Sequence, residues 1–481
     1  MGKTGAAKSP LQKDPFFGRH QELAFLSERY NSNKSEFLPV YGRRRVGKST
    51  LLQHFIVKRK GMFFVGKEAP AQLQINEFMG LLAEVTKQPL LRDISVTTWG
   101  KAFDYFEEYA LSTREKFILV LDEFQWMVGE SRELPSIIQE RWDHRWKRSG
   151  NLFLVLCGSY IGFMEREVLG EKSPLFGRRT GQILLKPFNY LEAAEFHPRL
   201  SVQDKACVWF LCGGIPYYLE QFSQRESIEQ NIIQQMLNDG SVLFREPEFL
   251  LREELREVGN FRAVLMAVAT GSLRLQEIET VTGLEKSKLS YYVNQLIELG
   301  YVQKDYPLFE GEINQRKVVY RLQDPLLRFW YRFVFSNASH LALRGPTAHF
   351  ERFIKAELDS YFGSCFELLC REALPFIYKN ERVNAAFNVG SYWDHKSVQI
   401  DVVGLREDQR TDLGECKWGK VTSGVGLLNE LERKVELFPN KRNATICRRI
   451  FTRYKLPLRG DHASGVQAHD LRDLYELKPY A

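Results

Sequence analysis

A glycine-rich loop near the start of the chain constrains the fold more than any other stretch. Residues 42–49 read GRRRVGKS and fit the pattern G-x-x-x-x-G-K-[ST]. The loop follows the apolar run 37–41 and opens the helix-like run 50–55. A strand, a glycine-rich turn and a helix in this order direct backbone N–H groups and the positive helix end at one anion. The pattern therefore predicts an α/β domain with a phosphate-binding loop.

The residues of this loop have separate expected roles around a nucleoside triphosphate. Lys48 would reach the β- and γ-phosphates, and the Ser49 hydroxyl would help to hold Mg²⁺. The rest of the cradle is expected from Gly42, Arg45, Val46, Gly47 and Thr50. A glycine turn that binds nothing is the alternative, and the strand–loop–helix context argues against it.

An acidic pair follows a second apolar segment. The run 117–121 is short and unbroken, as expected of a parallel strand covered on both faces. Asp122 and Glu123 stand at its carboxyl end, where open α/β sheets place their ligands. We expect Asp122 to hold Mg²⁺, directly or in its outer sphere, and Glu123 to orient or deprotonate the attacking water. A solvated acidic strand end is the alternative, which the phosphate loop upstream disfavours.

Three further motifs carry a family resemblance. They are FFGRHQEL at residues 16–23, PLFGRRT at residues 174–180 and GGIPYY at residues 213–218. Together with the phosphate loop and the acidic pair, they resemble the archaeal and bacterial P-loop ATPases on the border of the AAA+ and STAND groups. The resemblance implies ATP as the nucleotide and a helical lid that closes over it.

Carried onto this sequence, the resemblance implies roles for particular residues. Gly18 and Arg19, with Glu22, would recognise adenine, and Pro216 in the GGIP turn would help to close the lid. Arg178 or Arg179 would stabilise transition-state charge, either in cis or from a neighbouring subunit of a homo-oligomer. Two solvated arginines are the alternative.

The pattern changes after about residue 260. Helices are expected over 261–270 and 275–281, and a third ends at Gly300; strands are expected at 301–304 and 317–322. Three helices followed by a β-hairpin predict a winged helix-turn-helix, which would bind DNA through its third helix. Residues 272–322 hold seven basic and seven acidic side chains, so a module that contacts only protein is the alternative.

An aromatic run follows the winged helix. Residues 324–334 read DPLLRFWYRFV, which we interpret as packing of the core and of domain interfaces rather than as nucleic-acid stacking. The run also resembles the segment that joins the winged helix to a C-terminal domain in the same ATPases.

A second candidate site lies near the C-terminus. Residues 397–404 and 412–418 are expected to form a hairpin that places Asp401 opposite Glu415, with Lys417 on the same face as Glu415. Two such close carboxylates repel unless a cation lies between them, so we expect Mg²⁺ there and Lys417 as the group that activates water or stabilises the phosphate. The arrangement resembles the D…ExK core of PD-(D/E)XK nucleases, with Glu367 as an additional acidic candidate. An exposed hairpin with surface ion pairs is the alternative.

A basic stretch follows this candidate site. Residues 437–460 hold seven Lys and Arg residues and no acidic residue, which favours contact with a phosphate backbone. A solvated basic edge strand is the alternative.

Composition sets the remaining bounds. The 481 residues are 44% hydrophobic and 26% charged, and the net charge of +7 permits an anionic partner without requiring one. Seven cysteines without CxxC pairs, no signal peptide and no membrane-length apolar run predict a cytoplasmic protein without membrane contact. We expect a multidomain α/β chain with these parts: P-loop ATPase core 15–190, helical lid 191–255, winged helix 256–325, linker 326–350, and an α/β restriction-endonuclease-like domain 351–475.

The leading hypothesis is an ATP-hydrolysing protein that couples its nucleotide state to DNA binding or to Mg²⁺-dependent DNA cleavage. One alternative is a STAND-type signalling switch with a catalytically inactive C-terminal interaction domain. Another is a DNA-binding regulator that does not cleave.

Overall fold

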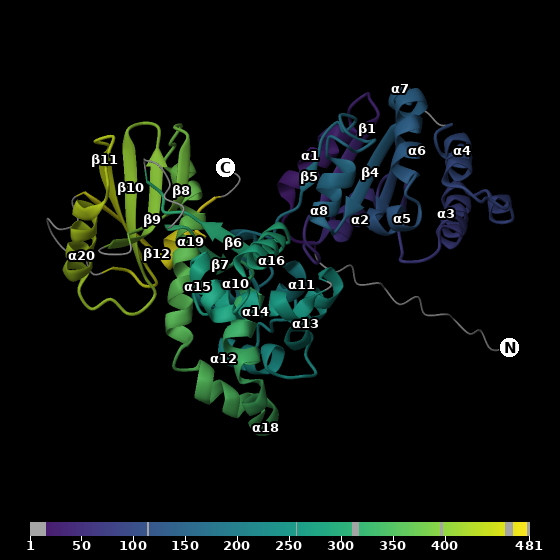
Figure 1. Cartoon of the computed structure of the whole chain (residues 1–481). Coiled ribbons are helices and arrows are strands. Elements are labelled where there is room, and N and C mark those ends of the chain that lie inside the picture. The colour runs from purple at the N-terminus through teal and green to yellow at the C-terminus, as the bar shows by residue number, and fades with distance from the viewer. Residues whose placement is uncertain are drawn as a thin grey trace, which may run out of the picture. The chain divides into compact units, whose positions relative to one another are not determined.

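The structure is a computed structural model, and it describes residues 16–112, 115–255, 257–309, 317–394, 398–456 and 465–478 (Figure 1). The chain divides into two compact units. The first contains the residues up to Val40, Lys48–Cys157 and Ser173–Ile183, and the second contains Tyr41–Gly47, Gly158–Lys172 and the chain from Leu184 onward.

A five-stranded sheet with the order β2-β3-β4-β1-β5 organises the first part of the chain. Its strands are β1 (Glu36–Tyr41), β2 (Gly61–Val65), β3 (Phe117–Asp122), β4 (Leu152–Gly158) and β5 (Ile183–Leu184). β3 pairs in parallel with β2 and with β4. Every residue of β1, β3 and β4 is buried, as predicted for parallel strands covered on both faces.

Helices surround this sheet. They are α1 (His20–Tyr30), α2 (Lys48–Ile56), α3 (Ala71–Thr86), α4 (Trp99–Ala110), α5 (Phe124–Glu130), α6 (Leu134–Arg141), the π-helical turn η2 (Trp142–Trp146) and α7 (Lys147–Ser149). Aromatic side chains fill the space between α3 and α4, where Phe78, Trp99 and Phe103 contact one another edge to face or tilted. Such rings bury large apolar areas and stabilise the unit.

The second unit begins with helices of the predicted lid. These include α9 (Tyr190–Ala194), α10 (Val202–Cys212), α11 (Pro216–Leu219), α12 (Ile228–Asn231) and α13 (Val242–Glu254). The predicted winged helix follows as α14 (Val258–Ala269), α15 (Leu275–Thr282), α16 (Lys286–Glu298), β6 (Val302–Asp305) and β7 (Val319–Leu322). The two strands pair antiparallel, and Gly300 ends the third helix at a φ of 72°.

The segment expected to be a linker is helical. It forms α17 (Pro325–Phe329), the π-helical turn η6 (Trp330–Val334), α18 (Ala338–His349) and a second π-helical turn, η8 (Phe350–Ile354). Phe329, Trp330, Tyr331 and Phe333 are buried, so the packing interpretation of the aromatic run is confirmed.

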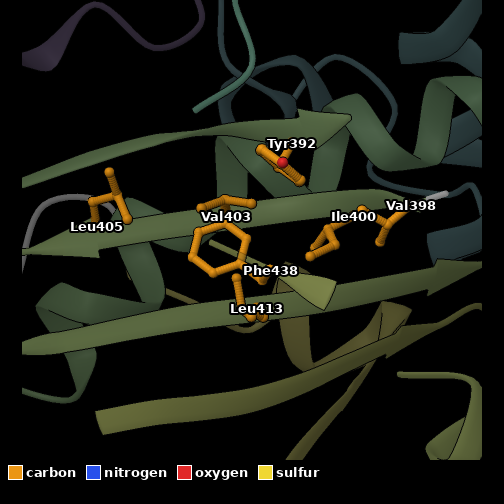
Figure 2. Packing of buried hydrophobic residues seen from close by; sticks show 7 residues of the cluster. All are labelled: Tyr392, Val398, Ile400, Val403, Leu405, Leu413 and Phe438. Atoms are coloured by element: carbon orange, nitrogen blue, oxygen red, sulfur yellow. The ribbon is translucent and has the colours of Figure 1, made fainter. Parts of the chain in front are cut away.

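The C-terminal part contains a second five-stranded sheet with the order β12-β11-β10-β9-β8. Its strands are β8 (Phe387–Asp394), β9 (Val398–Arg406), β10 (Arg410–Lys417), β11 (Thr445–Thr452) and β12 (Val466–Asp470), and its helices are α19 (Leu358–Asn380), α20 (Gly424–Leu437) and α21 (Leu471–Tyr475). β8, β9 and β10 run antiparallel, whereas β11 and β12 continue parallel to β10. Figure 2 shows the cluster of Tyr392, Val398, Ile400, Val403, Leu405, Leu413 and Phe438 that packs on this sheet.

Candidate nucleotide site and candidate nuclease-like site

The phosphate loop lies between the end of β1 and the start of α2, as predicted. Lys48 is the first residue of α2 and is buried. Gly42 has a φ of +155°, and a Cβ there would lie 2.3 Å from the carbonyl oxygen of Leu185. At Gly47, with a φ of +89°, a Cβ would lie 3.6 Å from Pro216 Cγ. Gly42 is therefore needed where the loop approaches the Leu185 backbone, whereas at Gly47 the positive φ, and not the contact with Pro216, favours glycine.

Ser49 and Asp122 come together at the carboxyl end of β3. The Ser49 hydroxyl donates a hydrogen bond of 2.6 Å to Asp122 Oδ2. The neighbouring thiol of Cys157 is buried, and burial followed by the Asp122 carboxylate raises its pKa, while Lys48 acts in the opposite direction. A hydroxyl, a carboxylate and an ammonium gathered in this way fit the binding of Mg²⁺ and a triphosphate.

Glu123 occupies a strained turn between β3 and α5. Its φ of 49° is left-handed, which is uncommon for a residue other than glycine. The buried side chain of Gln125 donates a hydrogen bond to Glu123 Oε2. This backbone conformation and this contact orient the carboxylate, and strain of this kind clusters at functional sites. Sequence reasoning missed Gln125, because an amide two residues after an acidic pair carries no pattern of its own.

The predicted adenine box forms contacts of its own. Gly18 and Arg19 have consecutive left-handed conformations, with φ values of 58° and 59°. The buried Arg19 forms an ion pair of 3.3 Å with Glu22, one turn into α1. Phe16 stacks on His54 with 4.1 Å between ring centroids. Recognition of adenine by these residues stays a prediction.

The variable positions of the phosphate loop hold three arginines, and sequence reasoning gave none of their side chains a partner. In the second unit, Arg43 pairs with Asp324 at 2.6 Å. Arg44 pairs with Glu253 at 2.6 Å. Both interactions hold the loop against helices far downstream in the chain.

Arg45 forms the third of these ion pairs. It lies 2.6 Å from Glu246 in α13, and its guanidinium lies 4.3 Å from the ring centroid of Tyr217. Burial raises the pKa of Glu246 to about 7, and the Arg45 charge opposes that rise. The expected contribution of Arg45 to the cradle is therefore from its backbone, because its side chain is bound to the lid.

The two arginines expected near the transition state differ in their surroundings. Arg178 is bound by the Asp143 carboxylate, with Nη2 at 2.7 Å from Oδ2, and also donates to the Pro174 carbonyl at 2.8 Å. Arg179 is exposed. Both line a hollow with Ser35, which directly precedes β1, whereas the phosphate loop follows the other end of this six-residue strand. Because six strand residues span about 20 Å, the prediction of a cis role is wrong. Action on a neighbouring subunit stays a prediction.

The C-terminal hairpin has the predicted register. Thr411 pairs with Leu405, and the ladder continues to Gly414 and Val402. The paired part of the two strands ends one residue before Asp401 and Glu415 would face each other. Asp401 Oδ2 instead accepts a hydrogen bond of 3.0 Å from the Cys416 N–H.

The acidic side chains of this site are nevertheless close and buried. Asp401 is 6% exposed and Glu415 is 1% exposed. Burial, followed by repulsion from Glu415, raises the pKa of Asp401 to about 6. Burial, followed by repulsion from Asp401, raises the pKa of Glu367 to about 7. The third acidic candidate thus belongs to the same cluster.

Two lysines neutralise Glu415. Lys417 Nζ lies 2.9 Å from Glu415 Oε1, and Lys434 Nζ of α20 lies 2.5 Å from Oε2. Sequence reasoning missed Lys434, because it comes from a helix that no hairpin pattern positions. Within the described ranges, no group of three or more His, Cys, Asp or Glu side chains is arranged to hold a metal ion. The countercharge expected from Mg²⁺ is thus provided by lysine.

The basic stretch after this site is partly structural. Arg449 is 1% exposed and pairs with Asp412 at 2.5 Å and with Glu381 at 2.8 Å. The expectation that this arginine follows a phosphate backbone is wrong, because burial and two carboxylates hold it inside the domain. Residues 457–460 of the stretch lie outside the described residues.

The sequence matches three known domain families in separate regions. Residues 16–222 match an ATPase domain found predominantly in Archaea. This part of the chain is a P-loop ATPase domain. Residues 264–306 of the ATPase match an IclR helix-turn-helix domain, and residues 330–432 match archaeal and bacterial proteins of unknown function. The predicted resemblance to archaeal P-loop ATPases and the multidomain α/β fold are confirmed.

Similar proteins come from archaea. An uncharacterized protein of Methanocaldococcus jannaschii is 28% identical over 405 residues, which cover 84% of the ATPase and 87% of that protein. An uncharacterized ATP-binding protein of the same organism is 44% identical over 45 residues, or 9% of the ATPase and 76% of that protein. The solved Walker-type ATPase of Pyrococcus abyssi is 20% identical, with a TM-score of 0.47, and the match covers 66% of this chain and 96% of that one. Among the described residues, no helix combines the length and apolar character needed to cross a membrane.

Proposed function

We propose that this ATPase couples its nucleotide state to DNA binding through the winged helix. The observation that supports this most strongly is the ion pair of Arg43, a residue of the phosphate loop, with Asp324 at the end of the winged helix. Its partner Asp324 is 1% exposed and also accepts a hydrogen bond of 2.8 Å from the Leu327 N–H at the start of α17. The guanidinium lies 4.9 Å from the ring centroid of Tyr301, which directly precedes β6.

Hydrolysis is assigned to the residues at the carboxyl ends of β1 and β3. Lys48 would bind the β- and γ-phosphates, and Ser49 with Asp122 would hold Mg²⁺, which would neutralise phosphate charge. Glu123 accepts a proton from the attacking water, and Gln125 keeps the carboxylate in position. The hydrogen bond between Ser49 and Asp122 supports this assignment, because it places both groups at one point.

Coupling follows from the ion pairs of the loop. When a triphosphate enters, the loop backbone adjusts to its oxygens, and each adjustment acts on Arg43 and Arg45. The partners of these arginines, Asp324 and Glu246, are buried. If an arginine moved away, its partner carboxylate would stay in the interior without water to replace the ion pair, which is costly. Nucleotide state therefore changes the stability of the contacts at the lid and at the winged helix.

The third helix of the winged helix presents the expected face. Lys286, Ser287 and Lys288 are exposed, and Tyr291 is 59% exposed, whereas Leu289 on the same helix is buried. A basic, aromatic face on this helix suits the major groove and the flanking phosphates.

A nucleotide-dependent binding experiment tests this proposal. Duplex affinity, measured by fluorescence anisotropy, is expected to differ about fivefold or more between a non-hydrolysable ATP analogue and ADP. The double substitution Lys286→Gln and Lys288→Gln is expected to weaken both states and to lower the slope of log affinity against log salt by about 1.8. Arg43→Ala is expected to remove the nucleotide dependence while leaving residual binding.

Lys58→Gln together with Lys101→Gln provides a matched control, because both lysines are exposed on the first unit. Equal duplex affinity in the ATP and ADP states of the wild type would contradict the coupling. Unchanged affinity in the winged-helix variant would remove DNA as its partner.

For the C-terminal domain we infer a nuclease-like site in which Lys434 restrains Glu415. The residues fit Mg²⁺ only if Lys434 leaves the Glu415 carboxylate, because both oxygens of that carboxylate contact lysines. With both Glu415 oxygens in contact with lysines, the site corresponds to the alternative of a silent interaction domain, as in a signalling switch or a regulator that does not cleave. Movement of Lys434 would convert the site into one that binds a divalent cation and cleaves DNA.

Metal titration separates these two states. Calorimetry with Mn²⁺ is expected to show weak binding to wild type, about tenfold tighter binding to Lys434→Gln, and none to Asp401→Asn. Binding should weaken as the pH falls from 8 to 5.5, because Asp401 and Glu367 gain protons in that range and protonated carboxyls do not bind metal.

Cleavage of linear DNA should then follow metal binding and should be lost in Lys417→Ala. The matched control is Lys420→Ala, which removes an exposed lysine shortly after the end of β10. Failure of Lys434→Gln to bind Mn²⁺ would leave the silent interaction domain as the function.

The proposal includes a homo-oligomer for one role. The exposed Arg179 would act on the nucleotide that is bound to a neighbouring copy of the chain. It lies at the opposite end of β1 from the phosphate loop of its own chain.

A further inference from the structure

A hollow of about 690 Å³ lies in the first unit, outside the nucleotide site. Its walls are the segments that precede β1, β4 and β5, together with the start of η2 and residues of α7. The phosphate loop leaves β1 at the opposite end. Since the six residues of β1 separate the two places by about 20 Å, the hollow is not part of the ATP site.

Basic side chains dominate this hollow. Five of them line it: Lys34, Lys147, Arg148, Arg178 and Arg179. All except Arg178 are exposed, and the one acidic residue in the lining, Asp143, already binds Arg178. Four exposed cations around one concave surface produce a positive potential that attracts anions.

The half-buried Lys116 lies next to this hollow and adds a positive charge. Lys116 Nζ donates to the carbonyl oxygens of Ser32 at 2.6 Å and of Lys34 at 2.8 Å. Burial lowers the pKa of Lys116, and the Glu36 carboxylate opposes that change. The Lys116 ammonium thus binds the segment before β1 through its backbone carbonyl groups, and that segment provides no negative charge to the hollow.

An aromatic ring stands at the rim of this basic hollow. Phe176 is 45% exposed, although it lies between the buried Leu175 and the turn at Gly177, whose φ is 72°. The buried Trp142 lies in the floor of the hollow and belongs to the core. A solvent-facing phenyl ring beside cations offers a base a surface on which to stack, while the cations bind its phosphates.

We propose that this hollow binds single-stranded nucleic acid, with phosphates at Lys147 and Arg148 and an unpaired base on Phe176. A free inorganic anion needs the cations but not the ring. A duplex keeps its bases stacked on one another and cannot use the ring. The site is independent of the winged helix and of the C-terminal acidic cluster, so it goes beyond the function proposed above.

The experiment measures binding of a labelled oligo(dT) to the full chain by fluorescence anisotropy across a salt series. The double variant Lys147→Gln and Arg148→Gln is expected to lose about tenfold in affinity, with a salt slope smaller by about 1.4. Phe176→Ala is expected to lose about fivefold with an unchanged slope, since it removes stacking but no charge. The control Lys58→Gln with Lys101→Gln should match wild type in both quantities.

Three results would overturn the assignment. One is wild-type affinity in the Lys147, Arg148 double variant. Another is loss of oligo(dT) binding in Lys286→Gln with Lys288→Gln but not in the hollow variants, which would assign the strand to the winged helix. A third is a change in sedimentation of the hollow variant without a change in oligo(dT) affinity, which would make the hollow a contact between copies. Circular dichroism and ATP hydrolysis at the wild-type level confirm that each variant is folded.

Discussion

Replacing Lys48 with alanine is expected to lower the rate of ATP hydrolysis by about 10²–10³-fold. Lys48 is buried at the start of α2, and its ammonium is the group proposed to bind the β- and γ-phosphates. Its loss leaves the charge that develops on the transferred phosphoryl group without its main protein counterion. The measurement is phosphate release at saturating ATP, together with the rise in melting temperature that ATP produces.

Two further variants make this result specific. Glu123→Gln should keep the ATP-induced rise in melting temperature and lose hydrolysis, because an amide cannot accept the proton of water. Lys58→Ala, an exposed lysine just beyond α2, should hydrolyse ATP like wild type. Hydrolysis at the wild-type rate in Lys48→Ala would remove the assigned site altogether.

The largest expected effect on stability is in the C-terminal domain, from Asp412→Ala. Asp412 is fully buried, accepts a hydrogen bond of 2.6 Å from the Tyr378 hydroxyl and pairs with the buried Arg449 at 2.5 Å. Removing Asp412 leaves the buried Arg449 guanidinium with Glu381 and His469 as polar neighbours, and breaking a buried pair costs about 3–5 kcal/mol. The free energy of unfolding, from denaturant titration followed by tryptophan fluorescence, measures this cost.

The matched control is Asp408→Ala in the adjoining hairpin loop. Asp408 also pairs with an arginine, Arg406, but its side chain is 36% exposed. An ion pair at such a position is worth about 1 kcal/mol or less. Equal losses in the two variants would show that burial does not decide the strength of these pairs. Replacing both Asp412 and Arg449 with apolar residues of similar size should recover part of the loss.

Local patterns predicted the parts of this protein that depend on neighbours in sequence. Each of these parts is a single helix, strand or turn. They are the loop at Gly42–Ser49, the apolar strand before Asp122 and the three helices before Gly300. Their periodicity and turn chemistry are sufficient, because the backbone geometry they encode is short-range. The hairpin register around Asp408 belongs to the same class.

Long-range contacts account for what the sequence did not reveal. Arg43, Arg44 and Arg45 read as interchangeable residues of a phosphate loop, yet each binds a different acidic residue more than two hundred residues later in the chain. Lys434 likewise reaches Glu415 from a helix. No periodicity marks such partners, since ion pairs between distant elements depend on how those elements pack.

The sequence by itself determined that this chain has a phosphate loop, an acidic strand end, a winged helix and an ExK hairpin, because each is a local arrangement of backbone and side chains. The tertiary structure alone decided what surrounds their charges. It buried Arg449 in a carboxylate pair, neutralised Glu415 with two lysines, and gathered four exposed cations at the far end of β1. Burial and the positions of opposite charges set the role of an ionic group, and both arise only when distant segments pack together.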